Sequence, residues 1–446
     1  MGGEWREARL GEVAEVRSGF AFKSSDMGSE GMPLIKIKNI TPPTVNVEDV
    51  QRVPEDIIRS IPRVERYRLE HQDILIAMTG ATVGKVGRFP RTNEFFYLNQ
   101  RVGKVYLKYP NNADYDFIYY VLAQPDYVHH MFGLADGSAQ ANISGTQIEQ
   151  LELPLPPFPE QRAIAHILGT LDDKIELNRR MNKTLEEMAR AVFKSWFVDF
   201  DPVRAKAAAR RQHPKWSNEK VSRAACPDLE PDLAALFPDA FQDSELGEVP
   251  EGWEVGTVDS CFDLTMGQSP PGSTYNEDGD GLPFYQGRAD FTFRFPTRRV
   301  YCTAPKRFAQ KGDTLISVRA PVGDINMAGE DCAIGRGVAA IRHKTGSRSF
   351  TYYAMRSFEG IFARFEAEGT VFGSIGKRDF HALKSVAPSR ILVARFEVMC
   401  SPKDSAIELN EEASRTLSAL RDALLPKLIS GELRVKDAER IAARAG

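Results

Sequence analysis

A stripe of mostly apolar residues recurs at alternating steps of four and three in the middle of the chain. This spacing puts the residues on one face of a helix and is typical of a coiled-coil seam. Pro159 near its start fits the preference of proline for a first helical turn. The pattern predicts a long helix from about residue 160 to 198. The seam consists of Ile164, Leu168, Leu171, Ile175, Asn178, Asn182, Leu185, Ala189, Val192 and Trp196.

A weaker stripe of the same kind lies near the C-terminus. Lys403, Arg421 and Pro402 interrupt it, so we expect this helix to begin or to kink at Pro402. Either each helix packs on its own domain, or the two pack on each other. We favour an antiparallel pair because both stripes carry a seam, in which asparagines would fix the register. The second seam consists of Phe396, Cys400, Ile407, Asn410, Ser414, Leu417, Leu424 and Leu428.

Short β-branched runs bounded by Gly, Pro and Asn precede each stripe and predict strands. They are "LIKIKNI", "DILIAM" and "RVGKVYLK" before the first stripe, and "TLISVRA" and "GVAAIRH" before the second. The segments "YDFIYYVLAQPD" and "SFTYYAMRSFEGIFARF" predict helices at matching places.

The chain contains an internal repeat. The tetrapeptide IELN occurs at Ile175 and again at Ile407, 232 residues later, and Leu185 and Leu417 share that offset. Upstream the offset drifts to 235 between Arg101 and Arg336, and to 240 between Asp73 and Asp313, as loop insertions between two copies of one domain would produce. The expected fold is therefore α+β, with two similar domains of mixed α/β character separated by two long helices that pack as an antiparallel coiled coil with pseudo-two-fold symmetry. We expect domains at 1–155 and 249–392, long helices at 156–200 and 393–446 (the latter with a C-terminal tail), and a connector with short helices at 201–248.

Composition is that of a globular protein, with 446 residues, 42% hydrophobic and 27% charged. No apolar run approaches the roughly 20 residues of a membrane helix, and no signal peptide is found at the N-terminus. The five cysteines lie far apart without a CxxC pair, so neither a zinc site nor a disulfide framework is indicated. We expect a reduced, cytoplasmic protein.

The net charge of −3 is unevenly distributed. Cations dominate in the segments 85–108, 204–223 and 288–307. Such patches on a neutral chain are typical of a protein that contacts polyanions at defined places, although each run is equally compatible with solvated surface charge.

The helical segments resemble the specificity subunit of type I restriction–modification systems. The motifs are "LPLPPFPEQRAIAHILGTLDDKIELNRRMNKTLEEMARAVFKSWFVDFDPV" and "LRDALLPKLISGELRV", with the domain openings "REARLGEVAEVRSG" and "PEGWEVGTVDSCFDLTMGQSP". The resemblance covers essentially the whole chain, but "SRILVARFEVMCSPK" lacks the "PEQRAI" opening of the first helix. It implies two target-recognition domains that each read half of a split DNA site, and helices that contact two methyltransferase subunits.

Within this resemblance, candidate DNA contacts are Lys, Arg, Asn, Gln and Ser residues in loops, because these side chains bind phosphates and base edges. Readers on one face of B-DNA sit about 10 bp apart, so two half-sites with an unread gap are expected. The candidates are Lys36, Lys38, Asn39, Lys85, Gln100 and Arg101 in the first domain, and Gln268, Ser269, Gln286, Arg288, Arg319, Arg336 and Arg378 in the second.

No catalytic motif is convincing. "TGATVGKVG" has three residues between its glycines instead of four and lacks the Ser/Thr of a phosphate loop, so we interpret it as a turn. "TPPT", "SPPG" and "VDFDPV" lack the complete Asn/Asp-Pro-Pro-aromatic motif of amino-methyltransferases, and the histidines show no metal spacing. We therefore expect no cofactor in this chain, and the resemblance implies S-adenosylmethionine, ATP and magnesium in methyltransferase and restriction/translocase partners. The alternatives are a coiled-coil protein scaffold without DNA and a self-contained methyltransferase.

Overall fold

The computed structural model describes residues 5–135, 141–319, 321–367 and 373–445. The chain divides into two compact units: unit 1 comprises Met1–Ile175 and Arg415–Gly446, and unit 2 comprises Glu176–Ser414. Both units mix helices with sheets, which confirms the predicted α+β class.

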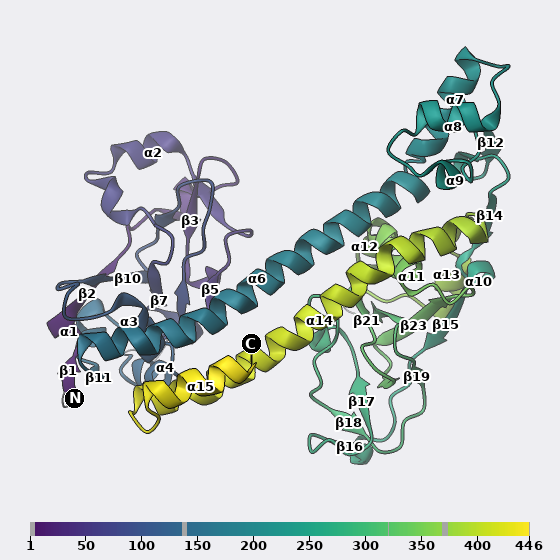
Figure 1. Ribbon diagram of the computed structural model, residues 1–446. Helices are drawn as coiled ribbons and strands as arrows, with labels where there is room; N and C mark the ends of the chain where they lie inside the picture. The colour runs from purple at the N-terminus through teal and green to yellow at the C-terminus, as the bar shows by residue number, and fades with distance from the viewer. Residues whose placement is uncertain (1–4, 136–140, 320, 368–372, 446) are drawn as a thin grey trace. The chain divides into compact units, whose positions relative to one another are not determined.

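In unit 1, a six-stranded sheet has the order β2-β10-β7-β8-β5-β4, a three-stranded sheet has the order β6-β3-β9, and β1 pairs with β11 (Figure 1). The predicted strands at "DILIAM" and "RVGKVYLK" are confirmed as β7 and β10, whereas "LIKIKNI" is broken by a 3-10 turn. The strands are β1 (Arg6–Arg9), β2 (Ala14–Ser18), β3 (Met32–Ile35), β4 (Ile40–Thr41), β5 (Thr44–Val45), β6 (Gln51–Val53), β7 (Ile74–Ala77), β8 (Val86–Arg88), β9 (Tyr97–Leu98), β10 (Val102–Leu107) and β11 (Glu152–Leu155).

Helices cover one side of this core, where the aromatic residues of α3 are buried together with the start of α6. Asp114 caps α3 by accepting a 2.9 Å hydrogen bond from the backbone N–H of Phe117, which explains where this helix begins. The helices of unit 1 before α6 are α1 (Leu10–Val13), α2 (Glu55–Ser60), α3 (Tyr115–Leu122), α4 (Pro125–Gly133) and α5 (Gly145–Ile148); the 3-10 turns are η1 (Ser24–Asp26), η2 (Ile37–Asn39), η3 (Val64–Tyr67) and η4 (Gly80–Thr82).

In unit 2, the sheets have the orders β15-β23-β20-β21 and β16-β18-β17-β22-β19, and β14 pairs with β24. The order β15-β23-β20-β21 follows the same path along the chain as β2-β10-β7-β8 in unit 1. The strands are β14 (Glu254–Thr257), β15 (Phe262–Met266), β16 (Tyr275–Asn276), β17 (Leu282–Tyr285), β18 (Tyr301–Cys302), β19 (Phe308–Ala309), β20 (Thr314–Val318), β21 (Val322–Met327), β22 (Cys332–Ile334), β23 (Val338–His343) and β24 (Lys384–Ala387).

The predicted helix in "SFTYYAMRSFEGIFARF" is present as two consecutive helices, α11 and α12. Aromatic residues of α11 are buried in the core of unit 2 beside those of α6 and α14. The helices are α10 (Val258–Cys261), α11 (Arg348–Ser357), α12 (Glu359–Ala367) and α13 (Lys377–Ala382), with the 3-10 turns η5 (Gly272–Thr274) and η6 (Arg288–Asp290).

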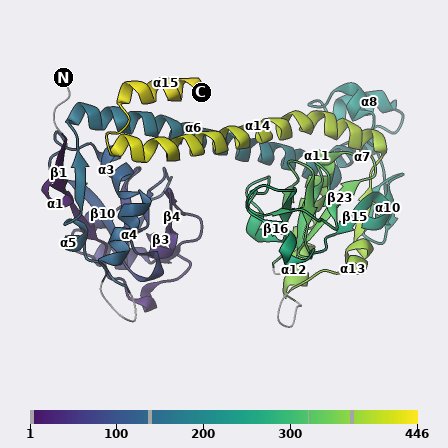
Figure 2. The same ribbon diagram turned by 90° about the horizontal axis from the view of Figure 1, so that it is seen from below.

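The two long helices are α6 (Phe158–Phe197) and α14 (Arg390–Ile429), and the boundary between the units falls within both. In each unit a stretch of α6 lies beside a stretch of α14 (Figures 1 and 2). Seam residues of both helices share one buried cluster in unit 1, including Leu168, Leu171, Ile175, Leu417 and Leu424. In unit 2 they share another, including Ala189, Phe396, Cys400 and Ile407, with Leu185 and Val192 packed against it.

The start expected for the second helix is wrong. The helix begins at Arg390, not at residue 393 or at Pro402, and it continues through Pro402. Ser389 explains the earlier start, because its hydroxyl accepts a 3.3 Å hydrogen bond from the backbone N–H of Leu392. Pro402 removes one backbone donor, but the apolar seam on both sides of it is buried, so tertiary packing outweighs that loss.

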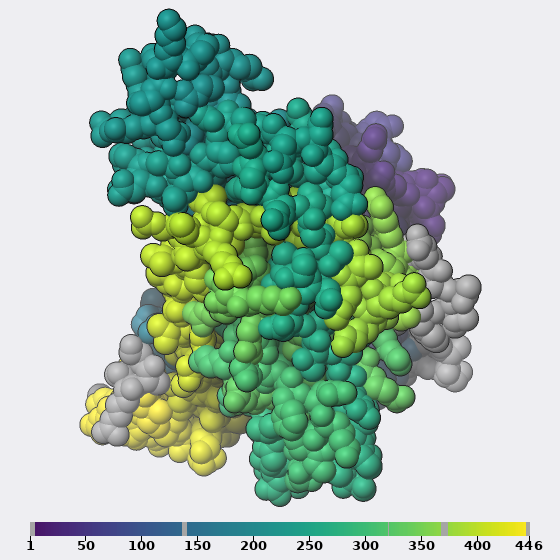
Figure 3. Space-filling model, turned by 90° about the vertical axis from the view of Figure 1, so that its right-hand side faces the viewer, coloured from purple at the N-terminus to yellow at the C-terminus, as the bar shows by residue number. Residues whose placement is uncertain are grey.

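The connector forms three helices and a hairpin within unit 2, and Figure 3 shows it in teal as an exposed mass. Its basic run does not present every cation to solvent. Lys206 is buried and donates hydrogen bonds to the carbonyls of Ala234 and Phe237, which ties the helices together. The elements are α7 (Asp201–Gln212), α8 (Asn218–Ala225), α9 (Pro231–Ala234), β12 (Phe241–Ser244) and β13 (Gly247–Pro250).

The predicted C-terminal tail contains a further helix, α15 (Val435–Ala445). Ala438 on this helix is buried in the core of unit 1. Among the described residues, no helix is long and apolar enough to cross a membrane.

Candidate nucleic-acid interface

Three loops meet at one end of the unit 1 strands. The backbone N–H of Gln100 donates to the carbonyl of Phe20 (2.9 Å), and that of Asn99 donates to the carbonyl of Ile35 (3.0 Å). These bonds join the loop after β2, the loop after β3 and the loop before β10. Three of the predicted contacts, Lys36, Gln100 and Arg101, therefore lie on adjoining loops.

Burial and nearby positive charges on these loops lower the pKa of Lys36. Burial lowers the pKa of Lys36, and the nearby charges of Arg101 and Lys38 lower it further. Cations that depress each other's charge favour a polyanion between them, because an anion would relieve the repulsion. Lys36 donates to the side-chain oxygen of Gln51 (2.8 Å), and Lys38 forms an ion pair with Asp49 (2.9 Å).

Asn39 is buried and is no longer expected to contact DNA. Its side chain is buried, its amide nitrogen donates to the carbonyl of Asp49 (2.9 Å), and its amide oxygen accepts from the backbone N–H of Lys36 (3.0 Å). These bonds fix the turn that carries Lys36 and Lys38, and burial keeps the amide of Asn39 away from a base edge.

Lys85 is exposed in the turn between η4 and β8. Gly84, next to it, has a φ of +82°, and a Cβ there would lie 2.6 Å from the carbonyl oxygen of Val128. The glycine is therefore required by the approach of α4 and by its own backbone conformation. This geometry explains "TGATVGKVG" as a packed turn, as predicted, and leaves Lys85 free to contact phosphate.

Unit 2 joins the corresponding loops in the same way. The backbone N–H of Gln268 donates to the carbonyl of Ile334 (3.0 Å), and that of Gly335 donates to the carbonyl of Tyr285 (2.8 Å). The backbone N–H of Arg336 donates to the hydroxyl of Ser269 (3.2 Å). The loops after β15, after β17 and before β23 therefore bring four predicted contacts together, with exposed side chains at Gln268, Gln286 and Arg336.

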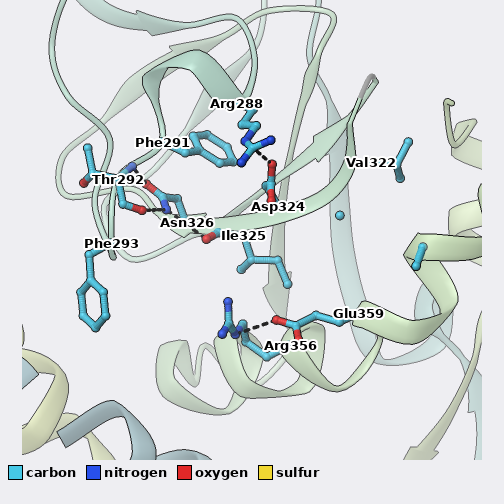
Figure 4. A pocket seen from close by; sticks show the side chains of 12 residues that line it. Arg288, Phe291, Thr292, Phe293, Val322, Asp324, Ile325, Asn326, Arg356 and Glu359 are labelled. Carbon is cyan, nitrogen blue, oxygen red and sulfur yellow. Dashed lines mark hydrogen bonds and ion pairs between the residues drawn. The ribbon is translucent and has the colours of Figure 1, made fainter. Parts of the chain in front are cut away.

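The remaining three predicted contacts in unit 2 are arginines. Exposed Arg319 follows Val318, whose backbone N–H donates to the carbonyl of Gly337 beside Arg336 (2.9 Å). Arg378 is exposed in the first turn of α13. Arg288 lies at the rim of a hollow of about 350 Å³ and pairs with Asp324 at 2.9 Å (Figure 4).

Sequence analysis missed a basic hollow in unit 1. Arg17, Arg63 and Arg66 line a space of about 660 Å³ together with Glu65. The ring of Tyr67 lies 5.6 Å from that of Phe20, which places this segment beside the loop cluster. The alternation of arginines with an aromatic residue in "RVERYR" was the available signal, because basic patches with interleaved aromatic residues are typical of nucleic-acid surfaces.

Among the described residues, no group of His, Cys, Asp and Glu is arranged to hold a metal ion. The clustered groups are side chains that donate or accept hydrogen bonds or neutralise phosphates. This arrangement suits recognition of a polyanion.

Comparison with known proteins agrees with this geometry. Residues 2–187 match the family described as "Type I restriction modification DNA specificity domain". Over 446 aligned residues the chain is 28% identical to the putative type I restriction enzyme MjaX specificity subunit of Methanocaldococcus jannaschii, covering 97% of this chain and 94% of that protein. It is 27% identical over 329 residues to the type I restriction enzyme HindI specificity subunit of Haemophilus influenzae, covering 65% of this chain and 71% of that protein.

A solved structure has a similar fold. The S subunit of a type I restriction-modification system from M. genitalium matches with a TM-score of 0.57 and 17% identity, over 96% of each chain. Residues 2–187 thus match the type I restriction modification DNA specificity domain family, and the resemblance seen in the helical motifs is confirmed.

Proposed function

We propose that the chain is the non-catalytic subunit that reads a bipartite DNA target and positions methyltransferase and restriction subunits on it. The observation that carries this proposal is the occurrence of one loop arrangement in both units. The loops after β2 and β3 and before β10 in unit 1 correspond to those after β15 and β17 and before β23 in unit 2. Since the side chains differ, with Lys36 and Gln286 at matching places, each unit would read its own half-site.

The long helices would hold these readers as an antiparallel coiled coil with pseudo-two-fold symmetry. Two hydrogen bonds within unit 2 support this. The Asn178 amide donates to the Ser414 hydroxyl (3.1 Å), and the Asn410 amide donates to the Asn182 side-chain oxygen (2.9 Å). Positions 410 and 414 lie 232 residues after 178 and 182, so a two-fold axis between the helices exchanges one bond for the other.

Partner subunits would use the outer face of the helices. Leu177, Met181 and Met188 on α6 are 48%, 45% and 51% exposed, and Leu409 on α14 is 66% exposed. Apolar side chains gathered on a solvent-facing helix surface mark protein contacts. Leu177 and Leu409 are repeat partners, which supports binding of two copies of one methyltransferase subunit. S-adenosylmethionine, ATP and magnesium would then be bound by the partners.

The test is to map adenine methylation in cells with and without this gene. We expect one interrupted motif that disappears with the gene and returns when the gene is restored. A methylation pattern that is unchanged by the deletion would contradict the proposal.

Binding measurements separate the alternatives. DNA affinity of the assembled complex should fall steeply with salt, because phosphate neutralisation releases counterions. A flat dependence would favour a protein scaffold. Methyl transfer by the isolated chain would favour a self-contained methyltransferase.

A further inference from the structure

An arginine stacks on a tyrosine pair in each unit. The pairs are Tyr119–Tyr120 on α3 and Tyr352–Tyr353 on α11, at matching places in the repeat. The guanidinium carbon of Arg88 lies 3.9 Å from the ring centroid of Tyr119, and that of Arg294 lies 3.9 Å from the ring centroid of Tyr352. Both units thus place a cation against a tyrosine pair, and Tyr120 of the first pair contacts α6 through Asp172.

The two arginines do not occupy matching positions. The backbone N–H of Arg88 donates to the carbonyl of Pro43 (3.0 Å), and the backbone N–H of Met327 donates to the carbonyl of Arg294 (2.8 Å). Arg294 therefore stands where unit 1 has Pro43, and Met327 stands where unit 1 has Arg88. The stacking arginine is therefore on strand β8 in unit 1, whereas in unit 2 it is in the loop that is hydrogen-bonded to the matching strand, β21.

The two units also differ in how a carboxylate on the long helices is neutralised. Asp172 on α6 and Asp404 on α14 are repeat partners. In unit 1, Asp172 pairs with Arg421 on the other helix (2.7 Å) and also accepts from the Tyr120 hydroxyl (2.7 Å). The helices of unit 1 therefore neutralise their own carboxylate.

In unit 2 the position that matches Arg421 is Ala189, which is buried and uncharged. Asp404 pairs instead with Arg294 at 2.7 Å, and their side chains are 1% and 0% exposed. Among the described residues, the second carboxylate oxygen of Asp404 has no hydrogen-bond partner. The same guanidinium reaches Glu186 on α6 (3.3 Å) and the Tyr353 hydroxyl (3.0 Å). A buried carboxylate on the helix thus depends on a cation from the recognition domain.

We propose that Arg294 determines which recognition domains the second position accepts: a domain docks there only if it brings a cation to Asp404. The first position imposes no such requirement, because Arg421 remains with the helices whatever domain is present. This inference rests on the proposed function for its biological meaning, since it concerns exchange of domains that read DNA. Its physical basis is the cost of a buried charge left without a partner.

Point variants of the full chain, co-expressed with its partner subunits, test the contact. Arg294→Met should accelerate amide hydrogen exchange in α11 and in residues 396–407 at least tenfold. Arg88→Met is the matched control: it removes the same stacking and an ion pair to half-exposed Asp116 but leaves Asp172 paired, so α3 should change less than threefold. Equal effects of the two substitutions would overturn the proposal.

Two second-site substitutions distinguish the loss of the charge interaction of Arg294 from the loss of its packing. Asp404→Asn in the Arg294→Met background removes the unpaired charge, and Ala189→Arg in that background supplies the cation from α6, as Arg421 does from α14 in unit 1. Each should restore most of the exchange protection. If neither does, Arg294 acts through packing alone and the proposal fails. Hydrogen exchange needs no DNA, so a failed methylation test of the proposed function would leave this result intact.

A domain exchange tests acceptance directly. Residues 254–387 are replaced by residues 6–155, between the matching strand pairs β14–β24 and β1–β11. This chimera has Pro43 at the place of Arg294, and its Arg88 pairs with Asp116 on α3, so no cation reaches Asp404 and the chimera should not assemble with its partners. With Ala189→Arg it should assemble and methylate an inverted repeat of the first half-site. Assembly of the chimera without Ala189→Arg would contradict the requirement, as would failure of both chimeras when the point variants are rescued.

Discussion

The side-chain amide of Asn410 donates a 2.9 Å hydrogen bond to the side-chain oxygen of Asn182 between α14 and α6 in unit 2, next to the bond between Asn178 and Ser414. Asn182 is 1% exposed, so an apolar side chain at this position would stabilise the folded state more than the amide does. A buried polar pair in a seam fixes which residues face each other, because a shifted register would leave the amides without partners.

Replacing this pair should separate register from stability. We expect Asn182→Leu with Asn410→Leu to raise the urea midpoint, since apolar burial replaces polar burial, while other registers become populated. Cysteines placed at 178 and 414 should form one disulfide quantitatively in the parent chain and incompletely in the leucine variant. A lower urea midpoint, or unchanged cross-linking, would contradict a register role.

Burying a charge in the seam should disrupt the helix pairing. Ile175 and Ile407 are 3% and 0% exposed. We expect Ile175→Asp combined with Ile407→Asp to destabilise each unit by about 3 kcal/mol or more and to abolish co-purification with the methyltransferase subunit. Val398→Asp, on the same helix as Ile407 but 69% exposed, is the control and should leave the unfolding free energy within about 0.5 kcal/mol. Retained assembly of the double variant would count against a paired-helix scaffold.

Residues that contact DNA should change how the affinity for DNA depends on salt concentration. We expect Arg101→Ala and Arg336→Ala each to weaken binding by the assembled complex and, if they contact phosphate, to reduce the slope of log affinity against log salt by about 1. An arginine that reads a base should instead relax specificity in one half-site only, with a loss of about 1–3 kcal/mol. Arg223→Ala on α8, an exposed arginine of the connector, is the control. Unchanged affinity and specificity for both variants would exclude these loops as the reading surface.

His343 should make unit 2 sensitive to acid. Burial, together with the nearby charges of Arg390 and Lys344, lowers the pKa of His343 to about 4. Between about pH 6.5 and 4 the unfolded chain binds a proton that the folded chain does not, so stability falls as the pH drops through this range. The loss approaches about 3 kcal/mol. The matching residue in unit 1 is Leu107, so His343→Leu should flatten the pH dependence of urea unfolding; an equally steep profile in this variant would assign the effect to other groups.

Part of the loop cluster in each unit could be predicted from the sequence. Lys36, Gln100 and Arg101, and likewise Gln268, Gln286 and Arg336, could be selected from their side-chain types. That their loops adjoin became visible only with the strand order of each sheet. Asn39 could not be judged in this way, because its amide is used by the carbonyl of Asp49 in a later part of the loop. Arg17 was missed because its neighbours Arg63 and Arg66 approach it only through the path of the intervening chain.

The sequence by itself predicted the long helices, their apolar stripes and the resemblance to the family, because periodicity and motif spacing are properties of neighbouring positions. Only the tertiary structure decided which charges meet. Arg294 and Asp404 are 110 residues apart and form a buried ion pair, while Ala189 stands where the repeat would have placed an arginine. The sequence alone does not show that a charge is missing, because only the fold identifies which buried carboxylate needs a partner.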